Sequence, residues 1–175
     1  RSWPQPKDNY GANKLSMEDH LDLYHANYRL PYVALRYPNV YGPRQNSKGE
    51  AGVVAIFVGA MLAGQPTKIT GDGKQQRDFT YVGDIARANR LALEGDAVGI
   101  FNVGTGVPTD INTVHEILTE ITAYPHKPAY IPRPVGEVLA TYLDSSKAKQ
   151  MLGWEPTVSL FDGLTNVVEW MRSQK

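Results

Sequence analysis

A tyrosine and a lysine stand four residues apart near the start of the chain, in the stretch DNYGANKLSMED. On a helix, residues with this spacing share a face, so Lys14 can lie beside Tyr10. A nearby ammonium ion stabilises a phenolate, and such a tyrosine can exchange a proton with a sugar hydroxyl near neutral pH. The lysine can also donate to the hydroxyls of a ribose. The alternative is an exposed tyrosine–lysine pair with no catalytic role on an ordinary helix, and the neighbouring motifs are needed to choose between the two interpretations.

Two further residues carry groups that suit a phosphorylated ligand. Arg77 follows the turn GDGKQQ, and a guanidinium there can bind a diphosphate through paired hydrogen bonds. Its alternative is a surface ion pair with Asp72 or Asp78. Asn39 lies in PNVYGP, where an amide can donate to a phosphate oxygen and accept from a hydroxyl. Its alternative is a turn of the chain after Pro38.

Val53 begins an apolar run, GVVAIFVGAMLAG, that predicts a helix ended by Gly64 and Pro66. The free N–H groups at the first turn of a helix suit an anion, so backbone groups near Val53 are candidates for contact with a nucleotide. The alternative for this helix is packing alone.

Composition excludes several classes of function. The 175 residues carry a formal net charge of zero, which gives no general attraction to nucleic acid or to an acidic membrane. There is no cysteine, so disulfides and thiolate chemistry are absent and a reducing cytoplasm is the expected compartment. No apolar run is long enough to span a bilayer. The histidines lack metal-ligand spacing, so no metal site is expected: His20, His25, His115 and His126.

Strands alternate with helices along the chain, which predicts an α/β fold. Asp110 is a candidate N-cap, Asp84 a candidate helix cap, and Trp154, Phe161 and Trp170 are expected to pack the closing helix. Buried strands are expected at 32–37 and 99–103, with a loop after the first of them, and further strands at 67–70 and 77–82. The periodicity predicts helices at 13–26, 52–64, 84–94, 111–123, 144–153 and 160–172.

The motifs YGANKLSMED, LRYPNVYGPRQ, GEAGVVAIF, GDGKQQRDFTYVGDIARA, FNVGTG and LGWEP occur in one order. In this order they resemble the extended short-chain dehydrogenase/reductase family, and within it the NAD-dependent nucleotide-sugar epimerases of the UDP-glucose 4-epimerase type. The resemblance implies that 1–175 is one truncated unit: a C-terminal nucleotide-sugar-binding lobe with the last strands of an incomplete Rossmann-type sheet. The glycine-rich N-terminal half of the family is absent from a sequence that begins at Arg1, and GDGKQQ does not replace it because it lies between two predicted strands.

The resemblance also implies roles for single residues. Tyr10 would be the general base and acid, and Lys14 would bind the nicotinamide ribose. Cofactor contacts are implied for Tyr10, Lys14, Tyr37, Pro38 and Val40, and substrate contacts for Asn39, Val53, Arg77, Arg133 and Glu137.

Three departures from the family pattern put parts of this assignment in doubt. Thr70 stands where the family has an aromatic residue near the nucleobase, which weakens a claim for uracil. Arg133 lies four residues before Glu137, where the family has three, which implies a local shift or a lost contact. Pro38 replaces a phenylalanine, so the contact at that position must differ.

The function implied is that of an NAD-dependent 4-epimerase of UDP-linked sugars, in which the intact parent binds NAD and this chain alone is inactive and binds NAD weakly at most. A 4,6-dehydratase or a decarboxylase of the same family is the alternative enzyme. A non-catalytic chain that only binds nucleotide sugars or self-associates is the alternative of another class. The resemblance further implies a cytoplasmic homodimer formed through the helix of Tyr10 and Lys14, with no nucleic acid or membrane partner.

Overall fold

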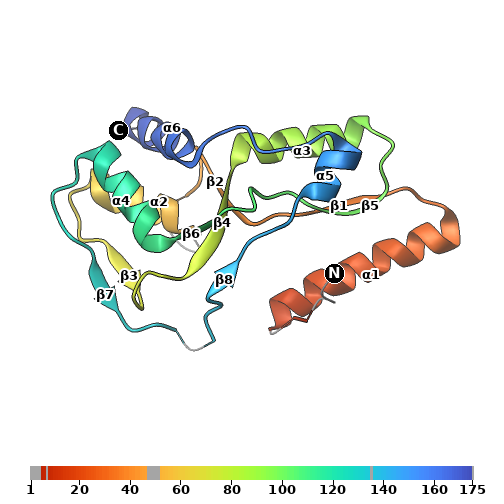
Figure 1. Ribbon diagram of the computed structural model, residues 1–175, viewed down its shortest axis with the longest axis horizontal. Helices are drawn as coiled ribbons and strands as arrows, with labels where there is room; N and C mark the ends of the chain where they lie inside the picture. The colour runs from red at the N-terminus through yellow and green to blue at the C-terminus, as the bar shows by residue number, and fades with distance from the viewer. Residues whose placement is uncertain (1–4, 7, 47–51, 135, 175) are drawn as a thin grey trace.

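The computed structural model describes residues 5–6, 8–46, 52–134 and 136–174, and these form the predicted α/β fold (Figure 1). The helices are α1 (Asn9–Tyr28), α2 (Val53–Leu62), α3 (Val82–Glu94), α4 (Ile111–Thr122), α5 (Ser146–Leu152) and α6 (Leu160–Ser173). The strands are β1 (Val33–Arg36), β2 (Asn39–Tyr41), β3 (Lys68–Thr70), β4 (Gln76–Tyr81), β5 (Gly99–Asn102), β6 (Pro108–Asp110), β7 (Ala129–Ile131) and β8 (Ala140–Thr141).

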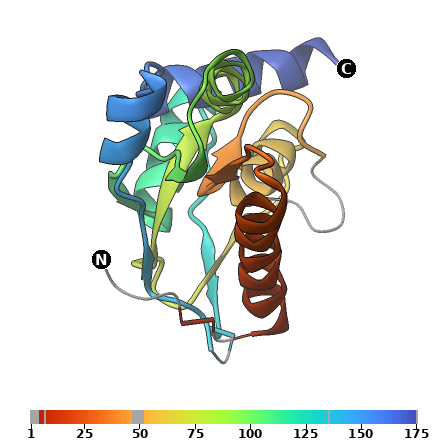
Figure 2. The same cartoon turned by 90° about the vertical axis from the view of Figure 1, so that its right-hand side faces the viewer.

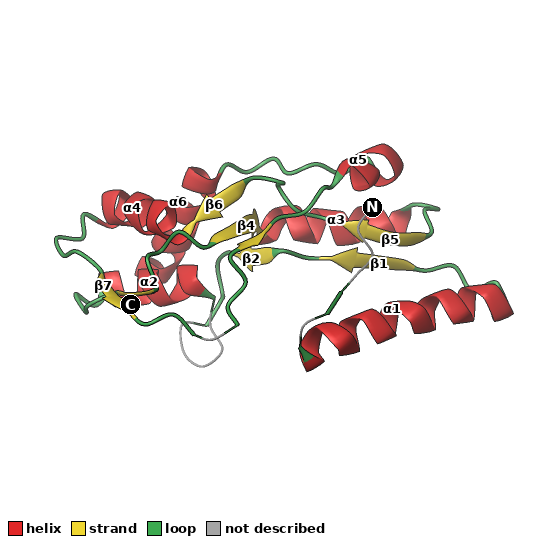
Figure 3. Cartoon of the chain, turned by 60° about the horizontal axis from the view of Figure 1, so that its bottom comes forward, coloured by secondary structure: helices red, strands yellow, loops and turns green. Residues whose placement is uncertain are grey.

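The two strands expected at 32–37 and 99–103 pair with each other. β1 and β5 run parallel, in a register that aligns Val33 with Gly99 and Arg36 with Asn102. Figures 1 and 3 show α3 and α5 on one side of this pair and α1 on the other. The expectation that both strands are buried is only partly right, because every residue of β1 is half-buried and Phe101 is the buried residue of β5.

A second group of strands surrounds β4. β2 and β8 pair parallel with β4 and β6 pairs antiparallel with it, while β3 and β7 form a separate parallel pair. The largest core packs against these strands from α2, α4 and α6, with Phe57, Leu118 and Leu164 among its buried side chains. Apolar burial of this kind provides most of the driving force for folding.

A smaller core lies between α3, α5 and β5. Trp154 is fully buried there with Phe101 and Leu152, and its indole N–H donates to the backbone oxygen of Asp84 at 2.8 Å. The expectation that Trp154 packs the closing helix is therefore wrong. It is wrong for Phe161 as well, since that side chain is 45% exposed on α6.

The predicted ends of several helices can be compared with the structure. Asp110 caps α4 as expected, since its carboxylate accepts from the N–H of Thr113 at 2.7 Å. Gly153 ends α5 with φ of 65°, a conformation that favours glycine. Asp84 does not cap α3: it lies inside the first turn and accepts hydrogen bonds from the backbone of Thr157 and Val158. The Asp84 carboxylate thus joins α3 to the segment before α6.

Helix α1 is longer than predicted and packs differently from the other helices. None of its side chains is buried, and Met17, Leu23 and Tyr24 are all more than half exposed. Figure 2, which faces this end of the molecule, shows α3 nearly end-on above the strands and α1 below them. The apolar residues of α1 therefore have no core within the described residues.

The segment after β1 is not the loop that the sequence predicts. Asn39–Tyr41 form β2, which aligns Asn39 with Phe79 of β4. Only Tyr37 and Pro38 remain as a connection between β1 and β2. Pairing with a distant strand overrode the local proline signal here.

Candidate active site

Tyr10 and Lys14 lie on the first turns of α1, and Asp8 fixes where that helix begins. The Asp8 carboxylate accepts from the backbone N–H of Gly11 at 2.7 Å, which satisfies one of the free donors of the first turn. The ammonium nitrogen of Lys14 lies over the Tyr10 ring, 5.4 Å from its centre. Tyr10 is 73% exposed, so its hydroxyl is open to a ligand. The structure thus brings the two side chains together as their spacing predicts.

A groove of about 660 Å³ runs between α1 and β1, and Tyr10 and Lys14 both line it. Tyr37 lines the groove from the β1 side, and its hydroxyl donates to the side-chain oxygen of Asn89 at 2.9 Å. Val40 instead packs against the smaller core from β2. Of the three cofactor contacts implied for Tyr37, Pro38 and Val40, only that of Tyr37 falls among the residues that line this groove.

A cluster of charged side chains lies at the start of β4. Nη2 of Arg77 is 3.6 Å from one carboxylate oxygen of Glu137, and Nε of Arg133 is 3.6 Å from the other. Nη2 of Arg133 also pairs with Asp72 at 2.6 Å. Arg77 and Glu137 are less than one-fifth exposed. Three residues that sequence analysis assigned to the substrate therefore lie together.

The ion pairs of this cluster identify the charged partners of Arg77 and Arg133. The alternative for Arg77, an ion pair with Asp72 or Asp78, is wrong, because the partner of Arg77 is Glu137. Across the four-residue interval between them, Arg133 and Glu137 form an ion pair. The Glu137 carboxylate oxygen that faces Nε of Arg133 is buried and has no hydrogen-bond partner among the described residues.

Asn39 and Val53 lie on two elements of the same part of the fold: β2, which pairs with β4, and α2, which packs on the core that includes Phe79. Asn39 is exposed at the start of β2 and aligns with Phe79, two residues after Arg77 on β4. Residues two apart on a strand share a face, so Asn39 and Arg77 belong to the same face of this sheet. Val53 begins α2, and Gly52 before it makes no side-chain capping bond. The N–H groups of the first turn of a helix can receive an anion, so the start of α2 is a candidate for this contact.

Residues 1–104, which include Tyr10, Lys14, Asn39 and Arg77, match the model of the NAD dependent epimerase/dehydratase family. The chain belongs to this family. The match covers more than half of the chain and confirms the resemblance to the short-chain dehydrogenase/reductase epimerases drawn from the motifs.

Individual proteins of the epimerase/dehydratase family are similar to this chain in sequence and in structure. A putative UDP-glucose 4-epimerase of Methanocaldococcus jannaschii is 44% identical over 96% of this chain and 54% of that protein. The UDP-glucose 4-epimerase of Thermotoga maritima, solved with UDP-glucose, is 46% identical with a TM-score of 0.95, over 99% of this chain and 59% of that one. The UDP-glucose 4-epimerase of Thermus thermophilus, solved with NAD, is 38% identical with a TM-score of 0.90, over 98% of this chain and 56% of that one. This chain spans a little over half the length of these relatives.

The groove residues fit one end of the dinucleotide that the family name implies. The Lys14 ammonium and the Tyr10 hydroxyl are donors suited to a ribose, and both line one groove. The described residues do not offer a glycine-rich turn that opens a helix for the phosphates. The Gly71–Gly73 turn joins β3 to β4, and the Gly104–Gly106 turn runs into β6.

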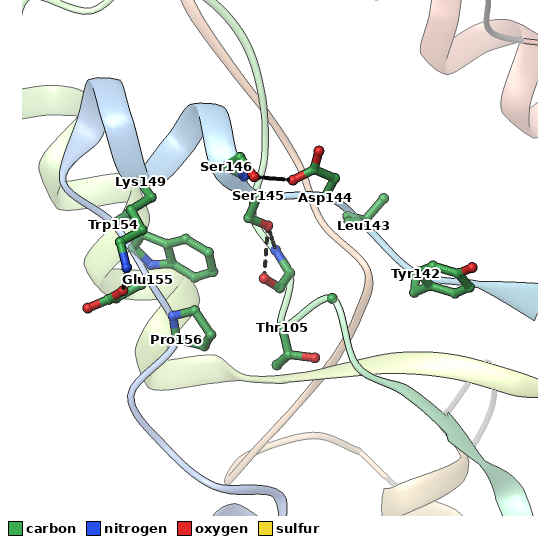
Figure 4. Close-up of a pocket in the computed structure, with 12 residues that line it drawn as sticks. Thr105, Tyr142, Leu143, Asp144, Ser145, Ser146, Lys149, Trp154, Glu155 and Pro156 are labelled. Carbon is green, nitrogen blue, oxygen red and sulfur yellow. Dashed lines mark hydrogen bonds and ion pairs between the residues drawn. The ribbon is translucent and has the colours of Figure 1, made fainter. Parts of the chain in front are cut away.

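A second cavity, of about 550 Å³, lies beside the FNVGTG motif (Figure 4). The hydroxyl of Ser145 bonds both the N–H and the oxygen of Gly104 at 2.8 Å, which closes one wall. The Asp78 carboxylate accepts from the N–H groups of Thr105 and Gly106, which holds this turn against β4. The lining includes none of the residues assigned to the site from the sequence.

The described ranges contain neither a metal-binding cluster nor a membrane-spanning helix. No cluster of three or more histidine, cysteine, aspartate or glutamate side chains there is arranged to hold a metal ion. No helix there has the length and apolar character needed to cross a membrane.

Sequence analysis missed two charged residues that line the groove, Glu18 and Arg36. They bond each other through two contacts, of 2.7 and 2.5 Å. The hydrogen bond to Glu18 is the main cause that raises the pKa of Arg36. The sequence could have indicated Glu18, because it lies four residues after Lys14, just as Lys14 lies four residues after Tyr10, and this spacing places all three on one face of a helix.

Proposed function

We propose that this chain carries the substrate-binding lobe and the proton-transfer pair of an NAD-dependent 4-epimerase of UDP-linked sugars, of the UDP-glucose/UDP-galactose type. The observation that carries the proposal is the presence, in one chain, of Tyr10 and Lys14 in a groove and of Arg77 in a separate charged cluster. The first arrangement suits proton transfer to a sugar hydroxyl, and the second suits a diphosphate.

Tyr10, as its phenolate, would take the proton of the sugar 4-hydroxyl, and the hydroxyl formed in this way would later return the proton to the 4-oxygen. Lys14 would stabilise the negative charge on Tyr10 when the proton is away, and would hold the nicotinamide ribose by its hydroxyls. NAD, when bound, supplies reversible hydride acceptance at the sugar C4. The exposed position of Tyr10 over the groove leaves its oxygen free for this exchange.

The nucleotide part of the substrate would be held by the second cluster. The Arg77 guanidinium would bind the diphosphate, with Asn39 and the first turn of α2 at Val53 beside it. The buried oxygen of Glu137 would accept from a substrate hydroxyl while Arg133 faces its carboxylate. Thr70 has no aromatic ring on which a nucleobase could stack, so the proposal rests on the diphosphate and the sugar rather than on the uracil.

We also propose that catalysis belongs to a longer polypeptide in which a dinucleotide-binding half completes the β1–β5 sheet. The relatives are nearly twice as long as the part that this chain matches. On its own, the chain would bind NAD weakly at most and would lack activity. We call the longer polypeptide the complete enzyme. The absence of cysteine supports the cytoplasm as its compartment.

Three alternatives are tested by what the complete enzyme does. The family name includes dehydratases, so a 4,6-dehydratase is the first. A decarboxylase is the second, since a UDP-N-acetyl-alpha-D-glucosaminuronate decarboxylase of Bacillus cytotoxicus is 34% identical to this chain. Release of a 4-keto-6-deoxy sugar would favour a dehydratase, and loss of carbon dioxide would favour a decarboxylase. A chain that only binds nucleotide sugars is the third candidate, and complete absence of turnover would favour it.

Calorimetric titration of this chain tests the assignment of the substrate lobe. We expect UDP-glucose to bind, and Arg77→Ala to weaken binding by about 10- to 100-fold, because a hydrogen bond to a charged group contributes about 1.5–3 kcal/mol. Arg90→Ala is the control, since Arg90 lies on α3 and pairs with Glu94 at the surface. Equal affinities for wild type and Arg77→Ala, or tight binding of NAD, would contradict the assignment.

A further inference from the structure

The helix that carries Tyr10 and Lys14 is held to the rest of the described chain by polar contacts rather than by a core. None of the 20 residues of α1 is buried. Two side-chain hydrogen-bonded contacts join α1 to the β1 segment, Glu18 with Arg36 and Asp22 with the hydroxyl of Tyr32, and the His25 ring packs edge-on against the Tyr32 ring. Where apolar packing is weak, such contacts decide how a helix sits.

The contact between Glu18 and Arg36 is the more restrictive of the two. One carboxylate oxygen accepts from Nε at 2.7 Å and the other from Nη2 at 2.5 Å, so the pair is bidentate. Two parallel hydrogen bonds fix direction as well as distance. The Glu18 side chain is 14% exposed, which limits competition from water.

The place of Glu18 along α1 connects this contact to the proton-transfer pair. Glu18 lies four residues after Lys14 and eight after Tyr10, so the three side chains follow one face of the helix. All three line the groove, and Arg36 lines its opposite wall. At 1.5 Å per residue, Tyr10 is about 12 Å from Glu18 along the axis, and a tilt of about 10° at Glu18 moves Tyr10 by about 2 Å.

We propose that the Glu18–Arg36 ion pair positions the reacting side chains, by fixing the rotation and tilt of α1 over the end of β1. Neither residue is assigned to proton transfer. The inference rests on the proposed function, because it explains how Tyr10 reaches the sugar hydroxyl at the required distance. A misplacement of about 1 Å can lower a rate by about 100-fold, so the loss of this pair acts on turnover rather than on substrate binding.

Kinetics of the complete enzyme test the inference. We expect Glu18→Gln and Arg36→Lys each to lower kcat by about 10- to 100-fold while KM for UDP-glucose stays within about threefold, since Arg77 and Glu137 lie outside the groove. The exchanged pair, Glu18→Arg with Arg36→Glu, restores at least about 10-fold of the loss relative to Glu18→Arg alone. Glu94→Gln, which breaks an exposed pair on α3, is the control and keeps kcat within about twofold.

A distance measurement on the 175-residue chain tests positioning without activity. The chain has no cysteine, so Asp19→Cys on α1 and Leu93→Cys on α3 give two unique sites for spin labels. We expect a narrow distribution of label distances in this background, and a broad or shifted one after Glu18→Gln.

The two experiments separate failure of the inference from failure of the proposed function. An unchanged distance distribution together with an unchanged kcat in Glu18→Gln overturns the positioning role and leaves the epimerase proposal intact. Absence of epimerase turnover in the wild-type complete enzyme overturns the proposed function, and the distance distribution then decides alone whether the pair holds α1. A rise in KM of about 10- to 100-fold in Glu18→Gln, with no change in kcat, would also overturn the positioning role.

Discussion

Asp78 and Arg77 are neighbours in β4, and their side chains have different partners on opposite faces of the strand. The fully buried Asp78 carboxylate accepts from the backbone of Thr105 and Gly106, while Arg77 faces Glu137. Successive residues of a strand point to opposite faces, so the two cannot pair with each other. The sequence shows this alternation, but it cannot show that Glu137, sixty residues later, is the partner of Arg77.

His115 is a buried histidine whose titration affects stability. Its Nε2 lies 2.8 Å from the hydroxyl of Thr67, and Phe57 and Tyr124 pack edge-on against the ring. Burial lowers the pKa of His115, so the unfolded chain binds its proton more readily than the folded chain does. The contribution to stability is complete above the unfolded pKa of about 6.5 and is lost as the pH falls through the lower folded pKa.

We therefore expect the free energy of unfolding to fall below about pH 6.5, with a slope from His115 of at most about 1.4 kcal/mol per pH unit. Urea unfolding at several pH values measures this slope. The variant His115→Gln keeps a polar side chain beside Thr67 and removes the titration, so its profile should be flatter. Parallel profiles for wild type and variant would show that His115 does not titrate on folding.

At the scale of elements, the helices could be predicted from local sequence pattern, whereas the short strands depend on long-range pairing. The helices at 52–64, 84–94, 111–123 and 160–172 were predicted because the apolar spacing that indicates a helix lies within each segment. The short strands β2, β6, β7 and β8 were not, because each has two or three residues, three of the four include or lie near prolines, and each depends on a distant partner. Pairing of this kind is not written in the strand itself.

Helix α1 carries a prediction about association. Leu23 is 57% exposed and does not line the groove, although apolar residues on other helices enter a core. We expect this chain to form a homodimer in which a partner covers α1, measured as twice the chain mass by light scattering. Leu23→Glu should weaken the dimer by at least about 10-fold, because a charge would replace buried apolar surface. Leu93→Glu, at an 88% exposed position on α3, is the matched control.

A monomeric mass for the wild-type chain at all concentrations would contradict the dimer. An equal effect of the two substitutions would place the interface elsewhere than on α1.

For the whole molecule, each of the two cores supports one half of the proposed site. The smaller core supports β1 and β5 and, with α1, the groove of Tyr10 and Lys14. The larger core supports β4 and α2, which carry Arg77 and Val53. The sequence motifs were enough to propose both sets of residues. The contact between Glu18 of α1 and Arg36 of β1 could not be predicted from the sequence, because it depends on how a helix without buried residues lies against a strand.

The central claim is that Tyr10 transfers the proton at the sugar 4-position, and its most direct test is the turnover of UDP-galactose by the complete enzyme carrying Tyr10→Phe. This substitution removes the hydroxyl and keeps the ring beside Lys14. We predict that kcat falls by about 100- to 10,000-fold, the range expected for loss of general acid–base catalysis, while the dissociation constant for the substrate changes by less than about threefold. Retention of wild-type kcat in Tyr10→Phe would contradict this account of the site.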